Sequence, residues 1–198
     1  ALDRLQPTAA SHDRVMILEV MGRDAGHIAL STGIAGGADV ILLPEIPYSI
    51  DAVAAKIKNV KAKGRNFALV VISEAVKKSD GGSSKMEYAD GERRYGGIGY
   101  TIGDEIAKAT GFETRVTILG HVQRGSAPSY NDRVLASAFG VKAVDLVAEG
   151  KFDRMVAWQD RQIVDVAIAD AIAAYQEVDL DGTLVHTARA LGICLGDK

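Results

Sequence analysis

Short, continuously apolar runs alternate along the chain with longer segments in which apolar residues recur every three or four positions. The apolar runs lie at residues 14–20, 39–45, 66–72 and 114–119, and such runs are typical of strands that are covered on both faces. The periodic segments at 27–35, 50–65, 98–110 and 129–149 predict helices. Strands that alternate with helices predict βαβ units, and therefore a three-layer, Rossmann-like α/β fold with a mainly parallel sheet and helices on both faces.

Shorter segments complete the pattern. Residues 77–97 are polar and rich in glycine, so they are expected to form a loop inserted within one unit. Residues 155–158 and 163–166 predict a small hairpin with Asp160 and Arg161 at its turn. Helices are expected at 167–175 and 183–191, and Asp24 is expected to cap the helix that starts at His27.

Composition and charge narrow the classes of protein. The 198 residues are enough for one large domain or two small ones. A net charge of −3 and a pI of about 5.8 give no electrostatic case for nucleic acid or an anionic membrane as a partner. The single Cys194 suits a reducing compartment, and no signal peptide or membrane-spanning run is evident, so a cytoplasmic protein is expected. The chain opens at Ala1 within an expected helix, which suggests a fragment of a longer protein.

Polar side chains follow three of the predicted strands at the points where the strands end. Arg23 follows the first strand, Glu74 follows the third, and His121 and Arg124 follow the fourth. The carboxyl ends of parallel strands meet at one edge of a sheet, where α/β proteins bind ligands. Arginine forks suit phosphate oxygens, histidine adds a donor, and a glutamate accepts hydrogen bonds from hydroxyl groups. The set predicts a site for a phosphorylated sugar or polyol.

Each of these residues also has a plainer interpretation. Arg23 and Arg124 could be solvated surface residues, Glu74 a helix cap, and His121 a satisfied core histidine. The glycines beside them could serve only tight turns. No phosphate loop, dinucleotide fingerprint, nucleophile elbow or metal-spaced His/Cys set is present in the sequence. From its residues alone, the chain is predicted to bind a sugar phosphate but shows no means of transforming it.

Several motifs surround these strand ends, namely Val20-Met21-Gly22-Arg23 with Asp24-Ala25-Gly26, Ile34-Ala35-Gly36-Gly37-Ala38-Asp39 before Pro44-Glu45, Ser73-Glu74, Leu119-Gly120-His121-Val122-Gln123-Arg124-Gly125, and Asp132-Arg133-Val134-Leu135-Ala136. At these residues the chain resembles the phosphofructokinase family, which has ATP-dependent and pyrophosphate-dependent members. The resemblance runs over nearly all of residues 1–198 but matches only the carboxy-terminal half of a family member. It implies a fructose 6-phosphate-binding domain at 1–125 and a segment at 126–198 that packs back on the amino-terminal domain, which this chain lacks.

The resemblance also implies roles for single residues. His121 and Arg124 would bind the 6-phosphate of fructose 6-phosphate, and Glu74 would hold sugar hydroxyls. Met21 and Gly22 would line the sugar through their backbone. The catalytic contribution of this half would come from Arg23, which would neutralise charge near the transferring phosphoryl group, while the base is expected in the missing half.

Two arginines at the starts of strands, Arg14 and Arg115, match family residues that reach the 6-phosphate of a neighbouring subunit. A homo-oligomer with shared sites is therefore expected. The effector-site positions of allosteric members fall at Gly37, Asp39, Lys63 and Arg65, where Asp39 and Arg65 are similar but not identical to the family's residues. Ala75 and Ser126 replace glycines that are common in the family.

The reaction implied for the whole protein is phosphoryl transfer from ATP to the 1-hydroxyl of fructose 6-phosphate, which gives fructose 1,6-bisphosphate in glycolysis. Mg²⁺ would be bound mainly through the donor phosphates and the missing half, with no metal ligands expected in this chain. The deciding residues for the donor are absent, so a pyrophosphate-dependent enzyme remains the first alternative. A non-catalytic sugar-phosphate-binding or regulatory domain is the second.

Overall fold

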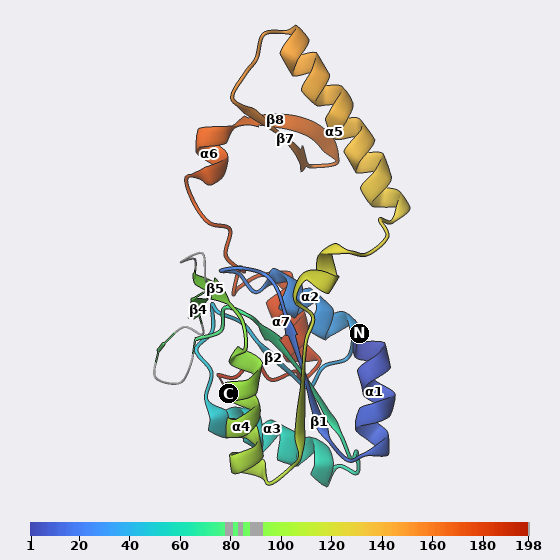
Figure 1. The fold of residues 1–198 in the computed structure, drawn as a ribbon, viewed down its shortest axis with the longest axis vertical. Helices are drawn as coiled ribbons and strands as arrows, with labels where there is room; N and C mark the ends of the chain where they lie inside the picture. Colours follow the sequence, from blue (N-terminus) through green and yellow to red (C-terminus); the bar gives the residue numbers. More distant parts are fainter. Residues whose placement is uncertain (78–80, 83–84, 88–92, 198) are drawn as a thin grey trace. The chain divides into compact units, whose positions relative to one another are not determined.

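The computed structural model describes residues 1–77, 81–82, 85–87 and 93–197 (Figure 1). The chain divides into two compact units, one formed by Ala1–Arg124 with Glu177–Lys198 and the other by Gly125–Gln176. Among the helices that the described residues build, none combines the length and the apolar content that crossing a membrane requires.

A four-stranded sheet forms the centre of the first unit. Its strands are β1 (Val15–Val20), β2 (Val40–Leu42), β3 (Ala68–Ser73) and β6 (Thr114–Ile118), in the order β2-β3-β1-β6, and all neighbours are parallel. The helices are α1 (Leu2–Ser11), α2 (His27–Ala35), α3 (Ile50–Ala62), α4 (Ile98–Thr110) and α7 (Thr183–Ala190). The predicted parallel α/β architecture is therefore confirmed.

Helices cover both faces of this sheet, and alternate residues of each strand serve the two faces. One core cluster joins Leu18 and Val20 of β1 to residues of α1, α2 and α7. The other joins Val15 and Ile17 of β1 to residues of α3 and α4. Figure 1 shows α1 and α4 on opposite sides of the sheet. β1 and β3 are buried along their whole length, as their continuous apolar runs predict.

The prediction that residues 114–119 form a fully buried strand is wrong. β6 is an edge strand of the sheet, its residues are half-buried or exposed, and 40% of Ile118 is accessible. One of its faces packs on α4, where Val116 belongs to the core, whereas no described strand pairs with its outer edge. An apolar composition reports that a strand is covered on a face and cannot report whether it lies at an edge.

The predicted loop at 77–97 is only partly described. Within it, β4 (Lys85–Glu87) and β5 (Arg93–Tyr95) pair as an antiparallel ribbon, and the remainder of the predicted loop includes residues outside the described ranges. The helix that follows, α4, begins after Gly97 and ends before Gly111, and both glycines have positive φ, at 80° and 75°. These two left-handed positions require glycine and explain the bounds of the helix.

The second unit contains α5 (Tyr130–Ala148), the hairpin of β7 (Arg154–Gln159) and β8 (Gln162–Ala167), and α6 (Ile168–Ile172). Ser129 and Asp132 form a capping box that starts α5. The predicted hairpin is confirmed, with Asp160 and Arg161 at its turn at φ values of 50° and 63°. Most of the predicted apolar stripe of α5 is not buried in this chain, since the helix buries only Leu146 and exposes the valines Val134, Val141, Val144 and Val147.

Residues 177–198 belong to the first unit of this chain. Val178 and α7 enter its core, and Cys194 forms a parallel bridge with Val40 of β2. The segment contributes side chains to both core clusters of the unit, and periodicity alone does not reveal such long-range packing. The expectation that residues 126–198 pack back on a missing amino-terminal domain stays a prediction.

Candidate functional site

Three consecutive backbone N–H groups after β1 are bound by side chains from the two neighbouring strand ends. Met21 N donates to Oε1 of Gln123 at 2.7 Å. Gly22 N and Arg23 N both donate to Oε1 of Glu74, at 3.2 and 3.0 Å. Glu74 follows β3, and Gln123 lies in η1 (Gly120–Arg124), the 3₁₀ turn after β6. The loop at Met21–Arg23 is therefore held from both sides.

This arrangement confirms that the polar residues at three strand ends lie at one edge of the sheet. β3, β1 and β6 are adjacent and parallel, so their carboxyl ends are neighbours. Main-chain bonds continue past the strands, from Glu74 N to Val20 O at 2.9 Å and from Leu119 N to Glu19 O at 3.1 Å. The sheet thus fixes where each loop begins, and the side-chain bonds fix the loop after β1.

The loop after β1 is a tight turn in which Arg23 takes the left-handed conformation, at φ 53°. Ala25 N donates to Gly22 O at 3.2 Å, and a Cβ placed on Gly22 would lie only 2.5 Å from Ala25 O. A non-glycine residue with positive φ is uncommon and is kept only where its surroundings hold it. The exposed Arg23 side chain is thus carried on a backbone that Glu74 and Gly22 shape.

The two carboxylate oxygens of Glu74 differ in their hydrogen-bond partners. Oε1 accepts both loop amides, whereas Oε2 has no hydrogen-bond partner in the part of the chain that the structure describes. The helix-cap interpretation of Glu74 is wrong, since it binds the loop at Gly22 and Arg23, 52 and 51 residues away in the sequence. The N–H groups of Met21 and Gly22 are already occupied, so the backbone of these residues could contact a ligand only through its other atoms.

The sequence interpretation did not assign a role to Gln123. Its position between His121 and Arg124 in the motif was the only sequence feature that pointed to the site. Spacing alone does not predict that its side chain binds Met21, 102 residues earlier. His121 and Arg124 are both exposed on η1, and Gly120 starts the turn with φ 50°. The interpretation of His121 as a buried core histidine is therefore wrong, and both side chains are open to a ligand.

A buried carboxylate lies directly beneath this edge. Glu19 of β1 is 1% exposed and accepts hydrogen bonds from Gly97 N at 2.9 Å and Gly99 N at 2.8 Å. Burial raises the pKa of Glu19 although these two bonds lower it, and repulsion from Glu74 adds to the rise. Glu19 therefore fastens the start of α4 to β1. Asp24 does not cap α2 as predicted, because the cap is Gly26, and Asp24 instead accepts from the Tyr95 hydroxyl at 2.6 Å.

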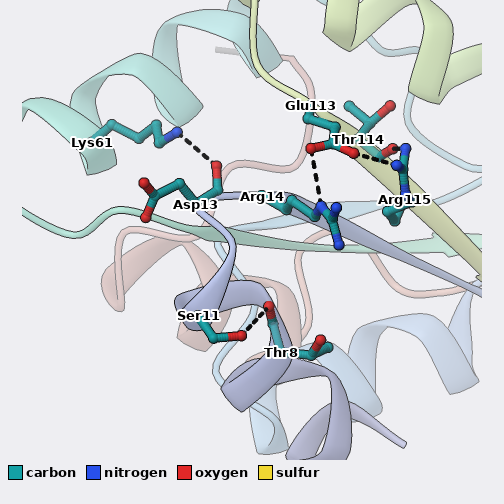
Figure 2. A network of polar contacts seen from close by, with 8 residues as sticks. All are labelled: Thr8, Ser11, Asp13, Arg14, Lys61, Glu113, Thr114 and Arg115. Atoms are coloured by element: carbon teal, nitrogen blue, oxygen red, sulfur yellow. Dashed lines mark hydrogen bonds and ion pairs between the residues drawn. The ribbon is translucent and has the colours of Figure 1, made fainter.

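Arg14 and Arg115 lie at the opposite end of the sheet, where the strands begin, and Glu113 lies between them. Arg14 Nε forms an ion pair with Glu113 Oε2 at 3.0 Å, and Arg115 Nη2 pairs with Glu113 Oε1, as Figure 2 shows. The hydrogen bond from Arg14 is the main reason that the pKa of the Glu113 carboxyl is lowered. No role was predicted for Glu113 from the sequence.

The end of the sheet where the strands begin and the end where they finish are too far apart for one arginine side chain to reach both. Arg115 and Gly120 are five residues apart along β6 and its extension, which corresponds to about 16 Å at 3.3 Å per residue. Arg14 lies at the same starting edge as Arg115, since Val15 and Met16 pair with Thr114 and Arg115. The structure therefore brings together Arg23, Glu74, His121 and Arg124 at one edge, and Arg14 with Arg115 at the other.

The four effector positions also lie on the side of the sheet where strands begin. Asp39 precedes β2 and is 7% exposed, its Oδ2 accepts from Leu69 N at 2.9 Å, and its Oδ1 pairs with Arg65. Lys63 is the exposed C-cap of α3, and Gly37 has φ 67° at the end of α2. Asp39 and Arg65 are thus engaged with each other in this chain.

A shallow hollow of about 430 Å³ lies beside α3, but its cations are engaged, Lys56 with Gly192 O at 2.6 Å and Arg189 with Asp197. Within the described residues, no three of His, Cys, Asp or Glu lie together in a way that could hold a metal ion. The edge with Arg23, Glu74, His121 and Arg124 is the candidate site.

Comparison with known proteins gives a consistent picture. The family model for phosphofructokinase matches residues 1–147. The ATP-dependent 6-phosphofructokinase 1 of Synechocystis sp. is 64% identical over 197 residues, covering 100% of this chain and 55% of the relative, and that of Nostoc sp. is 57% identical with the same coverage. The chain thus spans about half the length of these relatives. Among solved structures, the phosphofructokinase of Saccharomyces cerevisiae has a TM-score of 0.74 at 28% identity, over 96% of this chain and 23% of that one.

Proposed function

Because the chain belongs to the phosphofructokinase family, we propose that it is the sugar-phosphate-binding half of an ATP-dependent 6-phosphofructokinase. The reaction of the whole protein would transfer a phosphoryl group from ATP to the 1-hydroxyl of fructose 6-phosphate and give fructose 1,6-bisphosphate. The observation that carries the proposal is the convergence of Arg23, Glu74, His121 and Arg124 at one sheet edge. It matches the chemistry of a ligand with a phosphate at one end and hydroxyls along its length.

His121 and Arg124 would bind the 6-phosphate. Both are exposed on one short 3₁₀ turn, so one anion can reach both side chains. An arginine donates in a planar fork to two phosphate oxygens, and a bound phosphate favours the protonated imidazole. Charge-assisted hydrogen bonds of this kind each contribute about 1.5–3 kcal/mol.

Glu74 and Arg23 would serve the other end of the sugar. Oε2 of Glu74 can accept from a sugar hydroxyl while Oε1 continues to hold the loop amides. Arg23 would lie where negative charge develops on the transferring phosphoryl group, and a guanidinium already in place stabilises the transition state more than the ground state. The fixed backbone of residues 21–23 means that little reorganisation precedes the reaction.

Arg14 and Arg115 would bind the 6-phosphate in the site of a neighbouring subunit. Their place at the starting edge, about 16 Å along the strand from the chain's own site, supports this assignment. Glu113 holds the two guanidinium groups together there. A homo-oligomer with sites shared between subunits follows from the proposal.

The donor would be ATP with Mg²⁺. The named relatives between 47% and 64% identity are all ATP-dependent 6-phosphofructokinases, which favours ATP over pyrophosphate. We assign Mg²⁺ mainly to the phosphates of the donor and to the half of the protein that this chain lacks. The positively charged side chains of this half would act on the sugar phosphate.

A coupled assay on the full-length protein that contains this chain tests the proposal. We expect turnover of fructose 6-phosphate with ATP, and a KM for the sugar phosphate that rises at least tenfold in His121→Ala and Arg124→Ala, since each loses a charge-assisted bond of about 1.5–3 kcal/mol. His186→Ala and Arg4→Ala, which change exposed residues on helices α7 and α1, are the matched controls. Turnover with pyrophosphate and none with ATP would overturn the choice of donor. An unchanged KM in both site variants would overturn the phosphate assignment.

A further inference from the structure

The hydrogen bond between Gln123 and Met21 joins two parts of the proposed site that lie far apart in the sequence. Gln123 lies on η1 between His121 and Arg124, the residues assigned to the 6-phosphate. Its Oε1 accepts from Met21 N at 2.7 Å, in a half-buried position. Met21 begins the loop that presents Arg23, so one side-chain amide connects the phosphate end of the site to the phosphoryl-transfer end.

The other contacts of the loop do not make this connection. Glu74 binds the amides of Gly22 and Arg23, but it extends from β3 and not from the turn that carries the phosphate residues. The tight turn at Gly22 and the left-handed φ of Arg23 make this loop dependent on its anchors. Without Gln123, Met21 N would lose its acceptor at the point where the loop leaves β1.

We propose that Gln123 is a positioning residue, which ties the place of Arg23 to the place of the bound 6-phosphate. The inference rests on the proposed function. A phosphate held by His121 and Arg124 restricts η1, and Gln123 passes that restriction to Met21 and so to the loop. The turn η1 thereby binds the phosphate end of the sugar and also sets the position of Arg23, which acts at the other end. Gln123 itself needs no contact with the substrate.

Two variants of the full-length protein separate this role from substrate binding. Gln123→Met keeps the length of the side chain but removes the amide oxygen. Gln123→Glu keeps an acceptor for Met21 N and adds a negative charge beside the phosphate residues. Misplacement of a catalytic group by about 1 Å lowers rates on the order of 100-fold, so we expect a 10- to 100-fold lower kcat in Gln123→Met, with KM changed less than about threefold.

Gln123→Glu should show the opposite pattern, in which KM changes more than kcat. Its kcat is expected to stay within about threefold of the parent, while its KM for fructose 6-phosphate rises because the new carboxylate repels the phosphate. A residue that served only to stabilise the fold would not exchange a kcat effect for a KM effect between these two variants. Equal kcat values for the two variants, or an unchanged kcat in Gln123→Met, would refute the positioning role.

A second measurement does not depend on activity. Hydrogen exchange of the Met21 amide, followed by NMR in the full-length protein, reports the hydrogen bond directly. Loss of one neutral hydrogen bond of about 0.5–1.5 kcal/mol predicts exchange about 2- to 13-fold faster in Gln123→Met. In Gln123→Glu the amide should stay protected.

The two measurements distinguish failure of this inference from failure of the proposed function. If the full-length protein did not phosphorylate fructose 6-phosphate, the proposed function would fail, and with it the catalytic part of this inference. The Met21 exchange rate would still test the contact itself. If exchange accelerated in Gln123→Met while kcat did not change, the contact would be real and the positioning role refuted.

Discussion

Replacing Glu74 tests whether the loop after β1 is held by the carboxylate that the structure assigns to it. Glu74→Ala removes the acceptor of two backbone N–H groups, those of Gly22 and Arg23, at 3.2 and 3.0 Å. Hydrogen bonds to charged groups contribute about 1.5–3 kcal/mol each. Both bonds share a single oxygen of a half-buried side chain, which places each of them at or below the lower end of that range. The expected loss in the free energy of unfolding is about 2–3 kcal/mol.

Glu74→Gln should cost less, about 1 kcal/mol, because its amide oxygen still accepts from the two N–H groups without a charge. The measurement is urea unfolding of the first unit, followed by far-ultraviolet circular dichroism. Tryptophan fluorescence is not suitable, since the chain's one tryptophan lies in β7 of the second unit. Hydrogen exchange at the Gly22 and Arg23 amides gives a local reading of the same effect.

Glu113→Ala is the matched control, because it removes a carboxylate from the other edge of the same sheet. Glu113 is exposed and its ion pairs with Arg14 and Arg115 lie at the surface, where such pairs contribute little to stability. A loss in Glu74→Ala below about 0.5 kcal/mol, or no larger than that in Glu113→Ala, would show that Glu74 does not organise the loop.

Further predictions concern packing, protonation and turn geometry. A Cβ on Gly33 would lie 2.4 Å from two atoms of a fully buried isoleucine in β2, so Gly33→Ala should lower the free energy of unfolding, measured by thermal unfolding, by about 1–2 kcal/mol. Gly140 lies in open space on α5, so Gly140→Ala should raise the free energy of unfolding by about 0.5–1 kcal/mol. Burial raises the folded-state pKa of Glu19, so between the ordinary and the raised pKa the folded state binds more protons than the unfolded state. The free energy of unfolding should therefore fall as pH rises through that window. Glu19→Gln should flatten this pH dependence, measured by urea unfolding. The double substitution Asp160→Asn and Arg161→Gly matches two positive φ values at a hairpin turn, and should raise the melting temperature of the second unit as followed by tryptophan fluorescence.

The sequence predicted the sheet and its helices because the signals that decide them are local. Val15–Val20 and Ala68–Ser73 are apolar throughout and are buried along their length. Gly111 ends α4 in the left-handed conformation, and the turn of the second-unit hairpin lies where its residues predicted it. Such features depend on a few neighbouring residues, so a single sequence contains them.

What the sequence could not predict depends on contacts between distant segments. Whether β6 lies at an edge is decided by the strand order, and the return of residues 177–198 to the first unit is decided by the space beside β2. At the site, the positions of Glu74 and His121 followed from the strand ends. The hydrogen bonds from Met21 to Gln123 and from Arg23 to Glu74 cross 102 and 51 residues, and no spacing rule contains them.

Titration of the 198-residue chain with fructose 6-phosphate, followed by the NMR shifts of its backbone amides, tests most directly whether this half carries the sugar-phosphate site. The account predicts saturable shift changes at His121–Arg124 and at Met21–Arg23, weaker binding of inorganic phosphate, and no binding of fructose. The Arg124→Ala variant should lose the response. Shift changes centred on Asp39 and Arg65 instead, or equal responses to fructose and to fructose 6-phosphate, would contradict the account.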